Sequence, residues 1–234
     1  FFVGCATLPE PPEPADGMEK VAEYLREYTS ASAKELKNGG IAIVAVADGT
    51  ALVNEGFGMA NEAEQLPMSR HSVLRVGSVT KLFTAVAVMN LVEEGRVDLD
   101  RPYVEYVPEF SIRSRGEYPP ITVRDLLTHE AGLPGDLFNC WAYYGKEDES
   151  RRGEYRELLQ TLPSQYATMP PRKMFSYSNV GFALLGILIE RVAGEDYATY
   201  VGERLLAPLG MESTGFYPDD LPGGSRPLAY DLLT

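Results

Sequence analysis

The sequence contains few of the residues from which metal and redox sites are built. It has two histidines, His71 and His129, and two cysteines, Cys5 and Cys140. Cysteines and histidines this far apart give neither the ligand spacing of a zinc site nor a Cys-x-x-Cys redox pair. We therefore expect no metal ion and no cofactor.

Other common functional signals are also missing. There is no Gly-x-Ser-x-Gly motif and no phosphate-binding loop, and Gly56-Phe57-Gly58 lacks the third glycine of a dinucleotide-binding loop. A formal net charge of -13 argues against binding to nucleic acid, which requires a basic surface. No apolar run reaches the roughly 18 residues of a membrane-spanning helix.

The N-terminal residues suggest attachment to a membrane by another route. Apolar and small residues precede Cys5, as at the end of a bacterial lipoprotein signal peptide, although Phe2 is uncommon in that pattern. A Pro-rich stretch follows, so residues 1–16 are interpreted as a signal remnant and an extended tether. We expect a lipid at Cys5 and a location at the bacterial cell envelope. The alternatives are an apolar remnant without a role, or pairing of Cys5 with Cys140, which would exclude lipidation.

Residues 17–234 are predicted to form one α+β domain. A helix over 16–36, a buried strand over 41–46, a turn at Asp48-Gly49 and a strand over 51–57 indicate an antiparallel sheet flanked by helices. A mostly helical subdomain follows, with helices expected over 79–94, 122–128, 154–162, 181–193 and 196–206. Thr122-Val123-Arg124-Asp125 resembles a capping box at the start of the helix over 122–128, with Asp in place of the usual Glu or Gln. A long polar and aromatic loop over 136–152 interrupts it.

Ser78-Val79-Thr80-Lys81 is the first candidate for catalytic chemistry. Residues three apart on a helix share a face, so the Lys81 ammonium can reach the Ser78 hydroxyl. A serine is a weak nucleophile until a neighbouring group takes its proton, and a lysine can do so when its surroundings favour the neutral amine. The alternative is a helix-capping serine followed by a solvated lysine.

Tyr177-Ser178-Asn179 is the second candidate, in a loop before an apolar helix. A phenol can move protons when nearby cations lower its pKa, and an amide side chain can hold a substrate carbonyl or amide. The alternative is a turn with an aromatic plug and a helix cap.

These two motifs belong to an ordered set that resembles the serine β-lactamase and penicillin-binding superfamily, nearest the class C β-lactamase-related esterases and D,D-peptidases. The resemblance runs from about Lys20 to Tyr230 and includes Gly56–Asn61, Arg75–Thr84, Leu91–Gly95 with Asp98–Asp100, Ile121–His129, Gly132–Pro134, Tyr177–Asn179, Leu184–Gly186 and Pro208–Met211.

The resemblance implies a β-lactamase/transpeptidase-like fold and a role for each motif residue. Ser78 would form an acyl-enzyme, Lys81 would activate it, Tyr177 would transfer protons and Asn179 would bind the substrate. His129 matches a position that is mainly structural in the family; a triad in which Asp125 orients His129 stays open as an alternative. The substrate would be a β-lactam, a D-Ala peptide or a carboxylic ester, either a small molecule or derived from peptidoglycan.

One family motif has no counterpart in these 234 residues. The family carries Lys-Thr-Gly or His-x-Gly on a later strand, which supplies a second oxyanion-hole N–H, and we expect the C-terminal strands of the sheet to be absent from this chain. Loss of one such donor costs on the order of 3 kcal/mol. Besides a serine hydrolase, the sequence therefore leaves open an inactive relative that binds peptidoglycan or a protein partner, and a fragment with no function alone.

Overall fold

The computed structural model describes residues 9–13, 17–36, 39–137 and 157–216. The predicted lipidation site Cys5, Cys140, the helix start at 154–156 and all but the first two residues of the predicted loop over 136–152 lie outside these ranges. Contacts divide the chain into two compact units; of the described residues, those up to Arg75 belong to the first and those from Val76 onward to the second.

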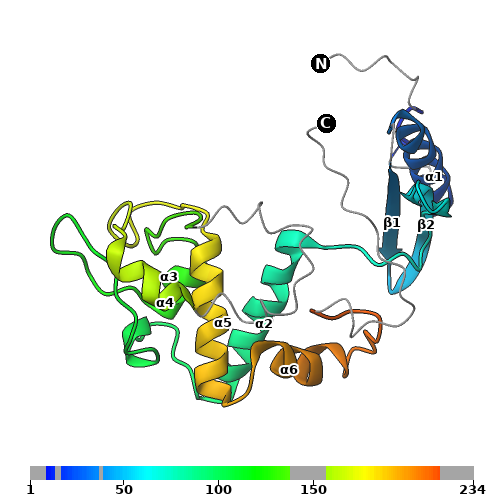
Figure 1. The fold of residues 1–234 in the computed structure, drawn as a ribbon. Helices are drawn as coiled ribbons and strands as arrows, with labels where there is room; N and C mark the ends of the chain where they lie inside the picture. Colours follow the sequence, from blue (N-terminus) through cyan, green and yellow to red (C-terminus); the bar gives the residue numbers. More distant parts are fainter. Residues whose placement is uncertain (1–8, 14–16, 37–38, 138–156, 217–234) are drawn as a thin grey trace. The chain divides into compact units, whose positions relative to one another are not determined.

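The first unit is a helix on a small antiparallel sheet (Figure 1). Its elements are α1 (Gly17–Glu35), β1 (Gly40–Ala47), β2 (Thr50–Asn61) and β3 (Leu66–Pro67), in the sheet order β1-β2-β3. Asp48 and Gly49 both have positive φ, as a tight hairpin turn between β1 and β2 requires. Arg26 of α1 donates to the carboxylate of Glu55 at 2.6 Å and to the carbonyl oxygen of Leu52 at 3.0 Å, so this helix lies against β2.

The prediction that the first strand is buried was wrong. Val44 and Val46 of β1 are 63% and 61% exposed. The apolar run predicts cover on both faces of the strand, whereas α1 is the only helix among the described residues of this unit, and the side chains of Val44 and Val46 are left uncovered.

The second unit is mostly helical. It contains η1 (Gly77–Val79), α2 (Thr80–Glu93), η2 (Tyr103–Glu105), α3 (Val123–Leu127), α4 (Leu158–Thr161), η6 (Leu162–Ser164), α5 (Asn179–Ala193), α6 (Tyr197–Val201) and η7 (Gly202–Leu206). The predicted helices are thus present, with shifted ends. The capping box predicted for α3 is confirmed, because Thr122 and Asp125 each bond the other's backbone N–H.

The core of this unit lies between α2 and α5, which run side by side (Figure 1). Fully buried side chains from both helices meet there, among them Ala87, Val88 and Leu91 from α2 and Leu184, Leu185 and Leu188 from α5. Burial of each large apolar side chain stabilises the fold by about 1.5–3 kcal/mol. Tyr103 is buried with them and donates its hydroxyl to the carbonyl oxygen of Leu184 at 2.8 Å. This packing fixes the start of α2 relative to the start of α5.

Two kinds of feature are absent from the described residues. No helix there is long and apolar enough to cross a membrane. No group of three or more His, Cys, Asp or Glu side chains in the described ranges is placed to hold a metal ion.

Candidate active site

Ser78 and Lys81 lie where α2 begins. Gly77 has a φ of 51°, which turns the chain into the short helix η1 that contains Ser78, and α2 continues from Thr80. Ser78 is exposed and Lys81 is partly buried. The Lys81 Nζ lies 3.4 Å from the Ser78 Oγ, so the one-turn spacing brings the two together as the sequence predicts.

Tyr177, Ser178 and Asn179 lie where α5 begins. Ser178 is the N-cap, and its side chain accepts a hydrogen bond from the backbone N–H of Gly181 at 3.0 Å. Asn179 is the first residue of the helix, whereas the sequence placed it in the preceding loop. This cap aims the side chains of Tyr177 and Asn179 at the start of α2, as their bonds to Ser78 and Lys81 show.

The four predicted site residues form one hydrogen-bonded group. The Ser78 Oγ lies 2.7 Å from the Tyr177 hydroxyl, and Lys81 donates to the Asn179 Oδ1 at 2.5 Å. The Lys81 Nζ also lies 4.8 Å from the centre of the Tyr177 ring. A nucleophile, a proton acceptor and a cation therefore converge from the starts of two helices.

The electrostatics favour ionisation of Tyr177. Burial acts to raise the pKa of its phenol, but hydrogen bonds with Lys81 and Ser78, together with the charge of Lys81, act in the opposite direction, and the net pKa lies below its ordinary value. An ionised phenol 2.7 Å from a serine hydroxyl is in position to accept its proton.

His129 supports this group through packing. Its ring centre lies 4.5 Å from that of Tyr177 and 5.0 Å from that of Phe182. Its Nδ1 accepts the backbone N–H of Ser178 at 3.1 Å, which requires an unprotonated Nδ1. Burial and then the charge of Lys81 lower the pKa of His129, which favours the same neutral ring.

The alternative of a triad with Asp125 is wrong. The Asp125 carboxylate is buried and accepts the backbone N–H of Thr122 at 2.9 Å and the guanidinium of Arg172. In the described part of the chain no hydrogen bond joins Asp125 to His129, so Asp125 does not orient this ring. Asp125 ties α3 to the segment that carries Arg172.

A loop between α3 and α5 is tightly bonded to the site. Gly132 has a φ of 67°, and a Cβ there would lie 2.1 Å from the backbone oxygen of Met169, so a side chain has no room. The carbonyl oxygens of Pro134 and Gly135 accept from the Ser178 hydroxyl at 2.6 Å and the Asn179 N–H at 2.8 Å. These contacts fix the residue that follows.

Asp136 is that residue, and the sequence did not single it out. Its Oδ1 accepts a hydrogen bond from the Asn179 Nδ2 at 2.8 Å. The sequence holds no local signal for this contact, because the two residues are 43 positions apart and an Asp in a polar loop is ordinary.

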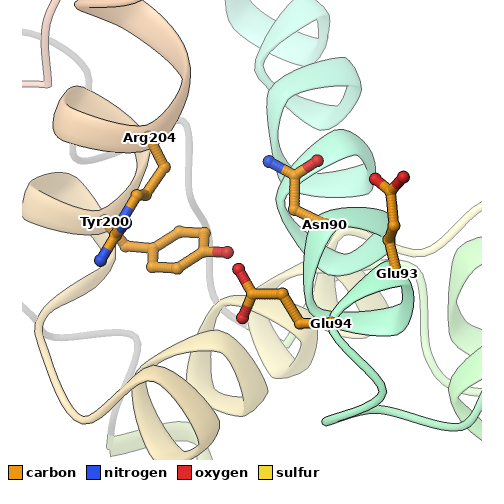
Figure 2. Close-up of a pocket in the computed structure, with 5 residues that line it drawn as sticks. All are labelled: Asn90, Glu93, Glu94, Tyr200 and Arg204. Carbon is orange, nitrogen blue, oxygen red and sulfur yellow. The ribbon is translucent and has the colours of Figure 1, made fainter.

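A hollow with polar walls lies at the other end of α2 (Figure 2). Its walls are Asn90, Glu93 and Glu94 at the end of α2, Tyr200 of α6 and Arg204 of η7. The Tyr200 hydroxyl points toward Glu94, yet this buried oxygen has no hydrogen-bond partner among the described residues (Figure 2). Burial, followed by the charge of Glu94, raises the pKa of this phenol.

Comparisons with known proteins match most of the chain. A family model described as "Beta-lactamase" matches residues 22–225. Protein flp of Staphylococcus aureus (strain MW2) is 27% identical over 193 residues, which cover 82% of this chain and 38% of that protein.

Solved structures are also similar to this chain. The octameric penicillin-binding protein homologue from Pyrococcus abyssi superposes with a TM-score of 0.70 at 33% identity, over 85% of this chain and 44% of its own. EstCE1, described as a hydrolase with promiscuous acyltransferase activity, gives a TM-score of 0.69 at 26% identity, over 85% and 54%. This chain therefore spans about 38–54% of the length of these three proteins.

Proposed function

The chain belongs to the beta-lactamase family, and we propose that it cleaves an ester or amide bond through an acyl-enzyme formed on Ser78. Its β-lactamase/transpeptidase-like fold, with helices and an antiparallel sheet, agrees with the sequence prediction. The observation that carries the proposal is the 2.7 Å contact between the Ser78 Oγ and a Tyr177 hydroxyl whose pKa is lowered.

The proposed reaction begins with a proton transfer from Ser78. With Tyr177 ionised, the Ser78 proton passes to the phenolate oxygen as the Ser78 Oγ forms a bond to the substrate carbonyl carbon, and the carbonyl electrons move onto oxygen. These electrons then re-form the carbonyl as the bond to the leaving alcohol or amine breaks, and Tyr177 gives the proton to that group. Water attacks the acyl-enzyme in the same way and gives a proton to Tyr177, which passes it to the Ser78 Oγ as the acyl bond breaks and the acid leaves.

Lys81 supports this proton transfer in two ways. Its charge and hydrogen bonding act on Tyr177 to lower the phenol pKa. Its bond to the Asn179 Oδ1 keeps the ammonium beside the nucleophile. In the substrate complex the 3.4 Å contact with Ser78 can shorten, since hydrogen bonds of catalytic groups often tighten when substrate binds.

The chemistry of the site defines the substrate class as a carbonyl bonded to a leaving alcohol or amine. β-Lactams, D-Ala peptides and carboxylic esters all offer one, so a small molecule or a peptidoglycan-derived peptide is proposed. Lipid attachment at Cys5 and a place at the bacterial cell envelope stay predictions from the sequence.

Active-site labelling tests the proposal. We expect a fluorophosphonate or a penicillin probe to modify the full-length protein at Ser78, identified by peptide mass spectrometry, and Ser78→Ala to abolish the labelling. Ser72→Ala, which removes a hydroxyl that is bonded to Ser69, is the matched control and should label normally. An unlabelled wild-type protein would contradict the proposal and favour a binding role, read out by retention on cell-wall fragments that Ser78→Ala leaves unchanged.

A further inference from the structure

We propose that Asp136 is a positioning residue of this site, which holds the Asn179 amide with its oxygen toward Lys81. Its catalytic meaning rests on the proposed function, but the bonding itself does not. Asp136, Asn179, Lys81 and Ser78 form a chain of contacts of 2.8, 2.5 and 3.4 Å.

Lys81 and Asp136 bond the Asn179 amide from opposite sides, and their chemistry fixes the orientation of this amide. An ammonium has only donors, and an ionised carboxylate has only acceptors. Rotation of the Asn179 amide by 180° would place its NH2 against the Lys81 ammonium and its oxygen against the Asp136 carboxylate. Both contacts would then be repulsive, so Lys81 and Asp136 together permit a single orientation.

The loop before Asp136 places the carboxylate for this task. The carbonyl oxygens of Pro134 and Gly135 are bonded to Ser178 and Asn179, so the loop is fixed to the residues that begin α5. The position of the Asp136 backbone is therefore fixed by contacts other than the bond between Asp136 and Asn179.

This arrangement leaves Asn179 free capacity toward a substrate. Its amide has two N–H donors and two acceptor lone pairs. One donor bonds Asp136 and one lone pair accepts from Lys81. One of each remains, so the substrate-binding role predicted for Asn179 is compatible with its position between the two charges.

Asp136 also acts on the proton acceptor. Its negative charge raises the pKa of Tyr177, against the effects of Lys81 and Ser78. Within the described ranges, the other groups that face this phenol are the Ser78 hydroxyl, the neutral ring of His129, which packs against it, and the Lys81 ammonium. Removal of the Asp136 charge would therefore lower the Tyr177 pKa further.

Asp136→Asn in the full-length protein tests both effects. The side chain keeps its size but loses its charge, and an amide at position 136 accepts Asn179 in either orientation. We expect the rate of Ser78 phosphonylation to fall by about 10-fold at its high-pH plateau, the size expected when a hydrogen bond to a charged group is lost. We also expect the rise of this rate with pH to move to lower pH.

Two variants separate this role from a structural one. Asp136→Glu retains the carboxylate and should keep the wild-type position of the pH profile. Asp100→Asn removes an exposed carboxylate that pairs with Arg124, and should leave both the rate and the profile unchanged. Labelling of Asp136→Asn at the wild-type rate and with the wild-type profile would overturn the inference while the proposed function stands.

A measurement that needs no activity keeps the two proposals distinguishable. The side-chain NH2 of Asn179 gives a pair of signals in a 1H–15N correlation spectrum, assigned by their loss in Asn179→Asp. We expect Asp136→Asn to shift these signals and Asp100→Asn to leave them in place. Signals that do not respond to Asp136→Asn would overturn the positioning role, even in a protein that no probe labels.

Discussion

Helix α2 carries polar groups at both ends, and the two ends differ in how these groups are bonded. At its start, Ser78 is bonded to Tyr177, which precedes α5, and Lys81 is bonded to Asn179, the first residue of α5. At its end, Glu94 pairs with Arg96, while the neighbouring Tyr200 hydroxyl has no partner among the described residues. Both ends contain a tyrosine and charged groups, so the kinds of residue present do not separate them.

The two ends of α2 differ in how the surrounding groups change the pKa of the tyrosine. The phenol pKa is lowered at Tyr177, where a cation and a serine converge on it, and raised at Tyr200, where burial dominates. A lowered phenol pKa suits proton transfer near neutral pH, whereas a raised one keeps the group un-ionised. A hollow with polar walls is thus weaker evidence for catalysis than a set of groups bonded to one another.

Loss of the cation should have the largest effect of the substitutions that separate the two ends. Lys81→Met removes both the charge that lowers the Tyr177 pKa and the donor to Asn179. We expect the rate of Ser78 labelling at pH 7 to fall by about 10³-fold, within the usual range for acid–base groups. The residual rate should rise with pH toward the ordinary pKa of tyrosine near 10.

The exposed Lys173, also in the second unit, offers the matched control. Lys173→Met should label at the wild-type rate. A Lys81→Met protein that labels as fast as Lys173→Met would contradict this prediction and would show that Lys81 does not contribute to the reactivity of Ser78.

Replacement of Tyr177 and of Tyr200 by Phe compares the two ends of α2 directly. Tyr177→Phe removes the proton acceptor but leaves the Lys81 charge 3.4 Å from Ser78, where it still stabilises negative charge on the nucleophile, so we expect a smaller loss in labelling rate, of about 10²-fold. In wild type the rate should increase through a pKa below 10, because ionisation creates the base, and this increase should disappear in Tyr177→Phe.

Tyr200→Phe should leave both the rate and its pH profile unchanged, because Tyr200 lies at the end of α2 remote from Ser78. An equal loss of rate in Tyr200→Phe and Tyr177→Phe would mean that the two substitutions act through the fold and not through proton transfer. Circular dichroism on all variants identifies such a loss of structure.

The smallest expected effect is on stability, in a comparison of Tyr200 with the buried Tyr103. Tyr103 is also buried, but its hydroxyl bonds the carbonyl oxygen of Leu184 at 2.8 Å. Tyr103→Phe should lower the free energy of unfolding by about 1 kcal/mol, whereas Tyr200→Phe should leave it unchanged or raise it, since no bond to a described residue is lost.

Urea unfolding of the two variants measures this difference. Equal destabilisation by Tyr103→Phe and Tyr200→Phe would contradict it and would mean that the Tyr200 hydroxyl has a partner, such as a water molecule in the hollow.

Local patterns predicted the elements well and their burial less well. The turn at Asp48-Gly49, the capping box at Thr122 and the helix over most of 79–94 depend on neighbouring residues, so they could be read from the sequence. Burial of β1 could not, because it depends on what covers each face of the sheet. The apolar run at Val44 and Val46 looked like a core strand, yet both side chains are exposed.

For the candidate site, the sequence by itself determined the one-turn spacing of Ser78 and Lys81, because helical geometry acts over a few residues. It also determined the family, through an ordered set of motifs. Only the tertiary structure decided that Tyr177 meets Ser78 across 99 positions, that His129 packs on Tyr177 and does not pair with Asp125, and that Asp136 bonds Asn179. The physical reason is that these contacts arise where helix starts and a loop are held together by the packing of α2 on α5 and by backbone bonds, which no short sequence pattern encodes.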